Sequence, residues 1–292
     1  MTNMTWEIGD VTVTKIVEVE MSLGGEFLFD ERVSVEELQK IGWLAPHFID
    51  ENGLLKISVH ALIVDTPTKR ILVDTCIGND KEREIPIFAN LQTKFLQDLE
   101  GAGFPRDSID CVLCTHLHID HVGWNTMLVD GKWVPTFPNS RYLFGKAEFE
   151  FWKQNDVDNA DGHIDQKMTF KDSVQPIWEA GLVDLVDLHE QICEEVSLEP
   201  TLGHTPGHVS VRIRSNGEDA LITGDFTHHP CQIAHPDWNS HVDYDAIQST
   251  ETRRAKYAEL ADTGTLVIGT HYATPTAGHI VRDADGYRLK VD

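Results

Sequence analysis

Short apolar runs and stretches of helical periodicity follow one another along most of the chain. Alternating or continuous apolar residues predict strands at 11–17, 59–64, 71–74, 109–113, 141–144, 209–213, 220–222 and 265–268. Apolar residues at helical spacing predict helices at 90–99, 146–153, 173–180 and 246–261. The turn at 66–69 predicts a hairpin between the second and third of these strands. Strands and helices alternate in both halves, which predicts an α/β fold with helices outside two sheets.

The chain is expected to be a single domain spanning residues 1–292, because no repeat or Pro/Gly/Ser-rich linker divides it. The polar segment 154–172 is the one candidate for an insertion or a mobile lid. Residues 1–10 lack the basic and apolar regions of a signal peptide, and 18 apolar residues never run together. The five cysteines are scattered and odd in number, so we expect reduced thiols and a cytoplasmic protein.

One segment carries most of the candidate chemistry. Residues 114–125 read CTHLHIDHVGWN, and they directly follow the apolar run 109–113, which places the cluster where a strand ends. His116 and His118 point the same way on an extended backbone, so both imidazoles can reach one ion. Asp120 and His121 either complete that site or begin another. Imidazole and carboxylate are ligands that Zn²⁺ prefers, so the cluster predicts one four-ligand structural zinc or a share in two metals.

Three later residues repeat this placement at strand ends. His204 lies in the loop GHTPGH before strand 209–213, Asp225 follows strand 220–222, and His271 follows strand 265–268. A carboxylate at the end of a buried strand is costly unless it is paired or bound to a metal. Each residue alone could be a capping or hydrogen-bonding group, but together they predict one metal site.

The motif His116-x-His118-x-Asp120-His121, followed by His204, Asp225 and His271, resembles the metallo-β-lactamase superfamily, as does the early triplet Val73-Asp74-Thr75. The resemblance implies an αββα sandwich with a dinuclear metal site at the edge between the two sheets. It implies two Zn²⁺ ions per chain, with Asp225 as a bridge and Asp74 as support for a ligand. It assigns the first zinc to His116, His118 and His204, and the second to Asp120, His121 and His271.

Within the superfamily, the ligand string is similar to the lactonase branch that includes acyl-homoserine lactonases. This implies hydrolysis of a carboxylic ester, with a lactone favoured, by a hydroxide that bridges the metals, with Asp120 moving a proton. Many such lactonases place a tyrosine near the metals, and residues 226–230 contain none. His228 is the candidate to replace it as hydrogen-bond donor or acid, the alternative being a structural histidine. Alternative functions are a glyoxalase II-like thioesterase, a phosphotriesterase or aryl esterase, and a metal-binding sensor without turnover.

Charge narrows the choice of partner. The chain has 24 Lys and Arg against 48 Asp and Glu, a net charge of −24 at pH 7. Such a surface repels nucleic acid and anionic membranes, so we expect a small-molecule ester or lactone as the partner. Mn²⁺, Fe²⁺ and Co²⁺ fit the same ligands as Zn²⁺. The sequence is compatible with a homodimer and does not specify the oligomeric state.

Several other residues have simpler expected roles. Cys111 and Cys114 lie on opposite faces of the cluster strand and are expected to be a buried structural pair. Trp124 is expected in the core, and His279 is not expected to be a ligand. His208 is expected to orient the loop that carries His204. His235 and His241 are expected at the rim of the pocket, and residues 77–86 are expected to border the site.

Overall fold

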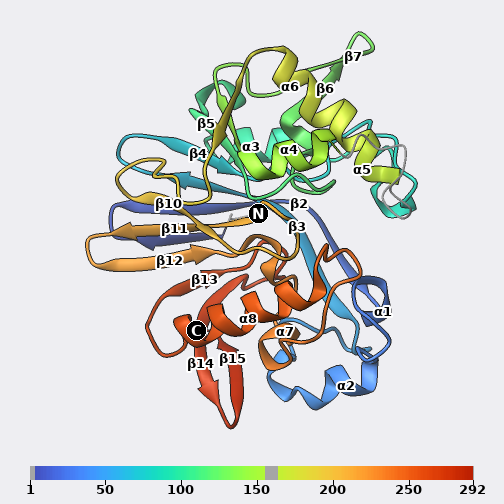
Figure 1. Ribbon diagram of the computed structural model, residues 1–292, viewed down its shortest axis with the longest axis vertical. Helices are drawn as coiled ribbons and strands as arrows, with labels where there is room; N and C mark the ends of the chain where they lie inside the picture. Colours follow the sequence, from blue (N-terminus) through green and yellow to red (C-terminus); the bar gives the residue numbers. More distant parts are fainter. Residues whose placement is uncertain (1–3, 155–163, 292) are drawn as a thin grey trace.

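The computed structural model describes residues 4–154 and 164–291, which form two β-sheets packed face to face between outer layers of helices (Figure 1). This is the predicted αββα sandwich. The first sheet contains, in order, β1 (Thr5–Ile8), β2 (Val11–Leu23), β3 (Leu55–Asp65), β4 (Arg70–Val73), β5 (Cys111–Cys114), β8 (Arg141–Gly145) and β9 (Val183–Val186). The second contains β10 (Val196–Pro200), β11 (Val209–Ser215), β12 (Glu218–Ile222), β13 (Leu266–Ile268), β14 (Ala277–Asp283) and β15 (Gly286–Lys290). A separate hairpin joins β6 (Thr126–Val129) and β7 (Lys132–Pro135).

Helices lie on both outer sides of the sandwich (Figure 1). The first sheet is covered by α3 (Phe95–Gly101), α4 (Lys146–Gln154), α5 (Ile164–Thr169), the π-helical turn η5 (Phe170–Val174) and α6 (Gln175–Glu179). On the other side lie α1 (Gly25–Leu28), α2 (Val35–Lys40), α7 (Cys231–Ala234) and α8 (Ala246–Leu260). Short 3₁₀ turns complete the connections: η1 (Gly42–Leu44), η2 (Pro86–Phe88), η3 (Arg106–Ser108), η4 (Gly123–Asn125) and η6 (Gly224–Phe226).

Three hydrophobic layers hold the sandwich together. The middle layer, between the sheets, includes Leu62, Leu113 and Val211, while separate clusters lie beneath the helices on each outer side. Cys111 faces the middle layer and Cys114 faces the helices α3 and α4, so the two thiols point to opposite faces of β5 as predicted. Burial of both faces explains why β5 is apolar at every position.

The carboxyl ends of parallel strands gather at one edge of the sandwich. β4, β5, β8 and β9 pair in parallel in the first sheet, as do β12 and β13 in the second. Backbone hydrogen bonds join the sheets here: Val209 N–H donates to Thr115 O at 3.1 Å, and Ser58 N–H donates to His271 O at 3.0 Å. This edge therefore brings together loops that are far apart in the sequence, as α/β folds commonly do at their binding sites.

The structure corrects some predicted element boundaries. The predicted helix 90–99 begins only at Phe95, because Asn90 adopts a left-handed φ of 51° and the Asn79 side chain binds the Thr93 backbone at 2.7 Å. The predicted strand 11–17 extends to Leu23 and the predicted helix 173–180 starts within η5. The C-terminal hairpin of β14 and β15 was not predicted. Of the polar segment 154–172, residues 155–163 lie outside the described residues, and the part from 164 onward forms α5 and most of η5.

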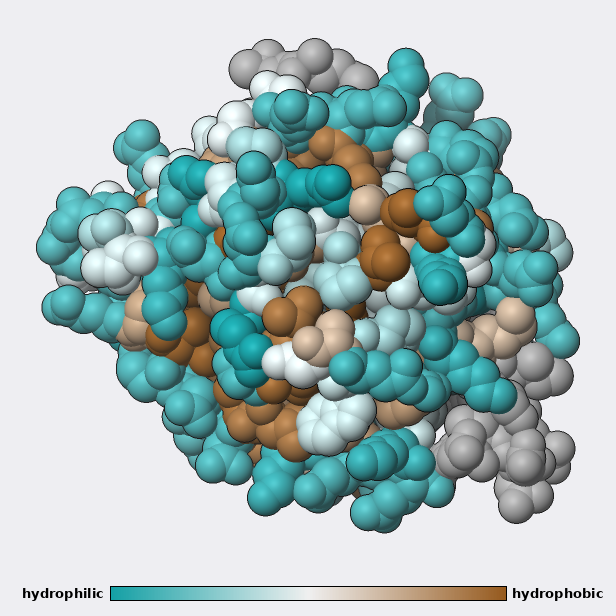
Figure 2. Space-filling model, turned by 90° about the horizontal axis from the view of Figure 1, so that it is seen from above, coloured by the Kyte–Doolittle hydropathy of each residue, from teal (hydrophilic) through white to brown (hydrophobic). Residues whose placement is uncertain are grey.

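The surface is dominated by polar residues. Figure 2 shows the face seen from above, on which hydrophilic residues surround small groups of hydrophobic ones. Within residues 4–154 and 164–291, the structure contains no helix with the length and apolar composition needed to cross a membrane.

Replacement of Leu62 by alanine tests the middle layer. Leu62 is 1% exposed between the sheets, so we expect L62A to lower the free energy of unfolding by about 2–5 kcal/mol through lost burial and a residual cavity. Urea denaturation followed by circular dichroism measures the change. The matched control is L128A, because Leu128 is 41% exposed and its truncation should cost less than about 0.5 kcal/mol. Equal losses in the two variants would contradict this account of the core.

Candidate metal centre

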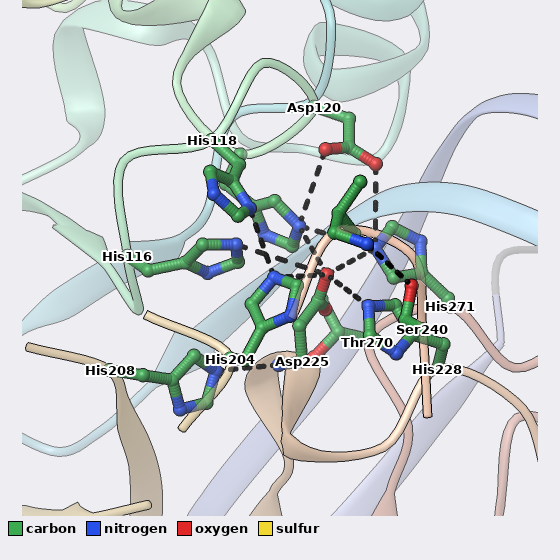
Figure 3. Close-up of polar contacts among 12 residues, drawn as sticks. His116, His118, Asp120, His204, His208, Asp225, His228, Ser240, Thr270 and His271 are labelled. Atoms are coloured by element: carbon green, nitrogen blue, oxygen red, sulfur yellow. Dashed lines mark hydrogen bonds and ion pairs between the residues drawn. The ribbon is translucent and has the colours of Figure 1, made fainter. Parts of the chain in front are cut away.

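The seven predicted ligands converge on one place at the sheet edge (Figure 3). The loop after β5 carries four of them, and the loop before β11 carries the fifth. η6 and the segment after β13 carry the last two. All are buried except Asp120, which is half-buried: His116, His118, Asp120, His121, His204, Asp225 and His271. The sequence motif therefore predicted which side chains the fold brings together.

One carboxylate oxygen, Asp225 Oδ2, is the centre of the cluster. The Nε2 atoms of His121 and His271 both lie 3.2 Å from it. The Nε2 atoms of three more histidines follow at 3.4, 3.6 and 3.8 Å: His228, His204 and His116. Five ring nitrogens thus surround a single oxygen.

The outward-facing ring nitrogens determine which way the lone pairs point. Nδ1 of His121 lies 2.9 Å from Asp74 Oδ2, Nδ1 of His204 lies 2.9 Å from Asp243 Oδ1, and Nδ1 of His271 lies 3.2 Å from the Ser58 carbonyl. Carboxylates and carbonyls only accept hydrogen bonds, so each Nδ1 donates and a neutral ring turns an Nε2 lone pair inward. This tautomer is the one that metal-ligating histidines adopt.

Inward lone pairs make the cluster fit a cation. His121 Nε2 and His271 Nε2 face each other at 3.2 Å, and when both rings are neutral neither has a proton there to share. Among the described residues, His116 Nε2 and Asp225 Oδ1 are buried without a hydrogen-bond partner. Buried polar atoms are normally satisfied, so these atoms indicate a ligand that accepts electron pairs. The residues present therefore fit metal ions.

The cluster divides into overlapping groups of potential ligands. One contains His116, His118 and His204, with His118 Nδ1 only 2.9 Å from His204 Nε2. Another contains Asp120, His121 and His271, in which the Asp120 carboxylate lies 3.6 Å from His121 Nε2 and 3.5 Å from His271 Nε2. These two groups contain the residues that the superfamily resemblance assigns to each zinc, while a further group, His116 with His121 and Asp225, connects them.

A third group joins Asp225 and His204 to His228. The His228 ring lies 2% exposed beside the cluster, parallel to the His271 ring at a centroid distance of 6.1 Å. Neither of its ring nitrogens has a hydrogen-bond partner among the described residues. His228 therefore lies at the centre with Nε2 turned toward Asp225 Oδ2 at 3.4 Å, where it can contact a bound ligand.

Asp74 and His208 hold the ligands from behind. Asp74, just after β4, adopts a left-handed φ of 57° and its carboxylate accepts Thr115 N–H at 2.8 Å as well as His121 Nδ1–H. It thereby fixes the ends of β4 and β5 together with a ligand. The ring of His208 accepts Asp225 N–H at 2.7 Å, and its Nδ1 lies 2.8 Å from Thr201 Oγ1, so it orients the backbone that carries Asp225.

Burial and neighbouring charges shift the pKa values of the clustered side chains. Burial lowers the pKa of His121, but Asp225 and Asp74 are among the carboxylates that outweigh burial and raise that pKa well above its ordinary value. Burial raises the pKa of Asp225, but the surrounding imidazoles bring it well below its ordinary value. Burial lowers the pKa of His116 well below its ordinary value, and the neighbouring histidines add to this effect. The carboxylates favour positive charge at the centre.

A cavity of about 620 Å³ opens onto the cluster. Its polar lining residues include His118, Asp120, Gln166, Asp225, His228 and His271, and the rest of its lining is mostly apolar: Met21, Leu23, Phe27, Leu28, Ile57, Val59, Ile85, Pro86, Phe88 and Val242. Cavities of this size and composition hold small-molecule ligands. The lining includes part of segment 77–86, which the sequence placed beside the site.

The remaining single-residue predictions have mixed outcomes. His241 lines the cavity as predicted, whereas His235 is not among the lining residues and instead stacks on Trp238 at 4.2 Å. Trp124 is in the core as predicted, 4% exposed and stacked on Phe95. The ring of His279 lies 3.0 Å from the Thr265 carbonyl and belongs to none of the ligand groups among the described residues.

Sequence reasoning missed the outer partners of two ligands. Asp243, which accepts from His204, is one of many acidic residues and has no motif to distinguish it. Ser58 acts through its backbone carbonyl, which any residue supplies. Gln166 was also missed, although it lines the cavity and donates to the Leu117 carbonyl. The polar composition of segment 154–172, which contains Gln166, predicted only an insertion or a mobile lid.

Comparison with known proteins gives one family and many structures of the same fold. The sequence profile of the metallo-beta-lactamase superfamily matches residues 56–271. Among curated proteins, none matches the chain. Two solved structures share 23% identity and a TM-score of 0.81, with 99% of this chain and 97% of the other covered: a hydrolase, AbOPH, of the beta lactamase superfamily, and AidC, a dizinc quorum-quenching lactonase in complex with a product.

A third structure, a probable metal-dependent hydrolase from Staphylococcus aureus, has 20% identity and a TM-score of 0.72, with 98% of this chain and 99% of the other covered. At these identities the likenesses show a shared fold.

Removal of metal should lower the thermal stability of the protein. A chelator leaves the inward lone pairs facing one another. Zinc at a free concentration one hundred times its Kd stabilises the folded state by about 2.7 kcal/mol. We expect zinc to raise the melting temperature of chelator-treated protein, as measured by differential scanning calorimetry. The variant H279A should keep this response and D225A should lose most of it. A melting temperature that does not respond to zinc would contradict the metal centre.

Proposed function

The chain belongs to the metallo-beta-lactamase superfamily, and on that premise we propose that it is a zinc-dependent hydrolase of a carboxylic ester, with a lactone bearing an apolar acyl group as the favoured substrate. We propose two zinc ions per chain, with Asp225 shared between them. The first ion is assigned to His116, His118 and His204, and the second to Asp120, His121 and His271. We also propose that residues 1–292 act as one domain, because both sheets contribute ligands.

The observation that carries this proposal is the composition of the cavity lining. Residues of the ligand cluster and many apolar side chains line the same cavity. A substrate with a polar reacting group and an apolar tail satisfies both kinds of lining, since burial of each CH₂ group contributes about 0.8 kcal/mol. The net charge of the chain, −24, disfavours the approach of polyanionic substrates. A dizinc lactonase bound to its product is among the proteins of the same fold, which supports the choice of ester.

Each polar group that lines the cavity has a distinct proposed task. Zinc ions held in this way lower the pKa of a water molecule and polarise a carbonyl oxygen. Asp120 lines the cavity, so its carboxylate is placed to take up a proton and return it to the leaving oxygen. His228 also lines the cavity, and its unused ring nitrogens can donate a hydrogen bond to the ester oxygen. The apolar wall positions the acyl group and excludes water.

Loss of a central ligand should remove metal and activity together. We expect D225A and H118A to reduce zinc content and to lower kcat/KM by at least about a thousandfold, since Asp225 has five histidines around one oxygen. The assay is a panel of lactones, aryl esters, thioesters, β-lactams and a phosphotriester, run beside metal analysis. Activity that survives without metal would contradict the mechanism. Rapid turnover of β-lactams or thioesters with lactones untouched would contradict the substrate class.

The role of His228 can be separated from metal binding. We expect H228F to lower kcat by about 10²-fold or more through loss of a hydrogen bond to the reacting oxygen, with zinc content unchanged. Steady-state kinetics on the best ester of the panel measures the change, and H235F serves as the matched control because His235 is not among the cavity-lining residues. Unchanged kcat and KM in H228F would remove His228 from the catalytic site. A loss of zinc would make it a ligand instead.

A further inference from the structure

We propose that Glu148 is a positioning residue that fixes both loops carrying His116, His118 and His204, and so sets the zinc affinity of that half of the centre. The inference rests on the proposed metal site. It concerns a residue outside the ligand motif, on the helix α4 rather than at a strand end.

The Glu148 carboxylate connects two loops that are distant in the sequence. Oε1 accepts Leu117 N–H at 3.1 Å, and Leu117 stands between His116 and His118. Oε2 accepts Gly207 N–H at 3.0 Å, and Gly207 follows His204 by three residues. One side chain that is 1% exposed therefore ties both loops to the same helix.

The packing around Glu148 leaves little room for the loops to shift. A Cβ on Gly207 would lie 2.3 Å from Glu148 N and 2.7 Å from its Cα, so the loop rests directly on the helix backbone. One turn along α4, Trp152 donates to Glu148 Oε1 at 2.6 Å and contacts the His118 ring at a centroid distance of 5.5 Å. The start of α4 is therefore a common support for this half of the cluster.

Glu148 has no direct contact with the anchors of the other half, although Asp74 also reaches His116 through Thr115. His121 is held by Asp74 after β4, and His271 is held by the Ser58 carbonyl on β3. Loss of the Glu148 carboxylate should therefore affect the two halves unequally. A site-selective effect distinguishes positioning from a general loss of stability.

Replacement by glutamine changes the chemistry with little change in shape. Three N–H donors bind the Glu148 carboxylate, and the Thr205 hydroxyl also interacts with it, so both of its oxygens must accept. A glutamine keeps one accepting oxygen and turns an NH₂ group toward an N–H. One of the two loops then loses its anchor.

Glu18 provides a matched control. It is a half-buried carboxylate that accepts Ile77 N–H at 2.7 Å, Gly78 N–H at 3.2 Å and Trp124 Nε1–H at 2.6 Å, with the Thr93 hydroxyl as a fourth donor at 3.2 Å. Two backbone N–H groups and one indole therefore bind it, as they bind Glu148. Its two backbone partners lie in a loop that carries no proposed ligand.

The test is a zinc competition titration of the full chain against a chelating indicator. We expect wild type and E18Q to bind two ions with similar affinities, and E148Q to keep one ion while the other binds about 10–100-fold more weakly. Both variants should lower the melting temperature. In an H271A background E148Q should weaken the remaining ion, and in an H204A background it should not.

Three outcomes separate the possible failures. Wild-type affinities at both sites in E148Q, or equal weakening in E18Q, would overturn the role of Glu148. If E148Q does not fold, E148D gives the same test, because it keeps the charge but is too short to reach both loops. A wild-type protein that binds no zinc would instead overturn the proposed metal site.

Discussion

Five imidazole nitrogens around one buried carboxylate oxygen set the main physical constraint on this protein. Lone pairs that face one another among buried side chains repel strongly, because the low local dielectric screens them weakly. The fold holds them in place through outward hydrogen bonds to acceptors, such as those from His204 to Asp243 and from His271 to the Ser58 carbonyl. The cluster is thus organised around a positive charge.

Several separate elements of the sandwich hold the ligand residues in place. Parallel strands in both sheets end at the same edge, and backbone hydrogen bonds from Val209 and Ser58 lock the sheets together there. Each sheet has its own cluster of apolar side chains under helices, besides the layer that the two sheets share. The ligand loops therefore rest on rigid, well-packed supports, which limits how far the ring nitrogens can move apart.

Local periodicity predicted an α/β fold with helices outside two sheets, and the ligand motif, through the superfamily resemblance, predicted the αββα sandwich and the seven converging residues. What they missed depends on contacts between distant segments. The start of α3 at Phe95 is set by the hydrogen bond that Thr93 N–H donates to the Asn79 side chain. β2 continues beyond residue 17 because its residues 19–23 pair with β3 past a register shift between Val17 and Val19. Asp243 and Glu148 likewise become recognisable only when their partners are seen.

The apolar wall of the cavity draws Met21, Leu23, Phe27 and Leu28 from the N-terminal part of the chain, ahead of residues 56–271, where the family profile matches. Part of the apolar lining is thus encoded outside the stretch that carries all the proposed ligands. Substitutions at these four N-terminal positions can change the size of the acyl group that the cavity accepts without changing the proposed ligands. The arrangement lets natural variation or directed evolution diversify the substrate range while the chemistry is inherited unchanged.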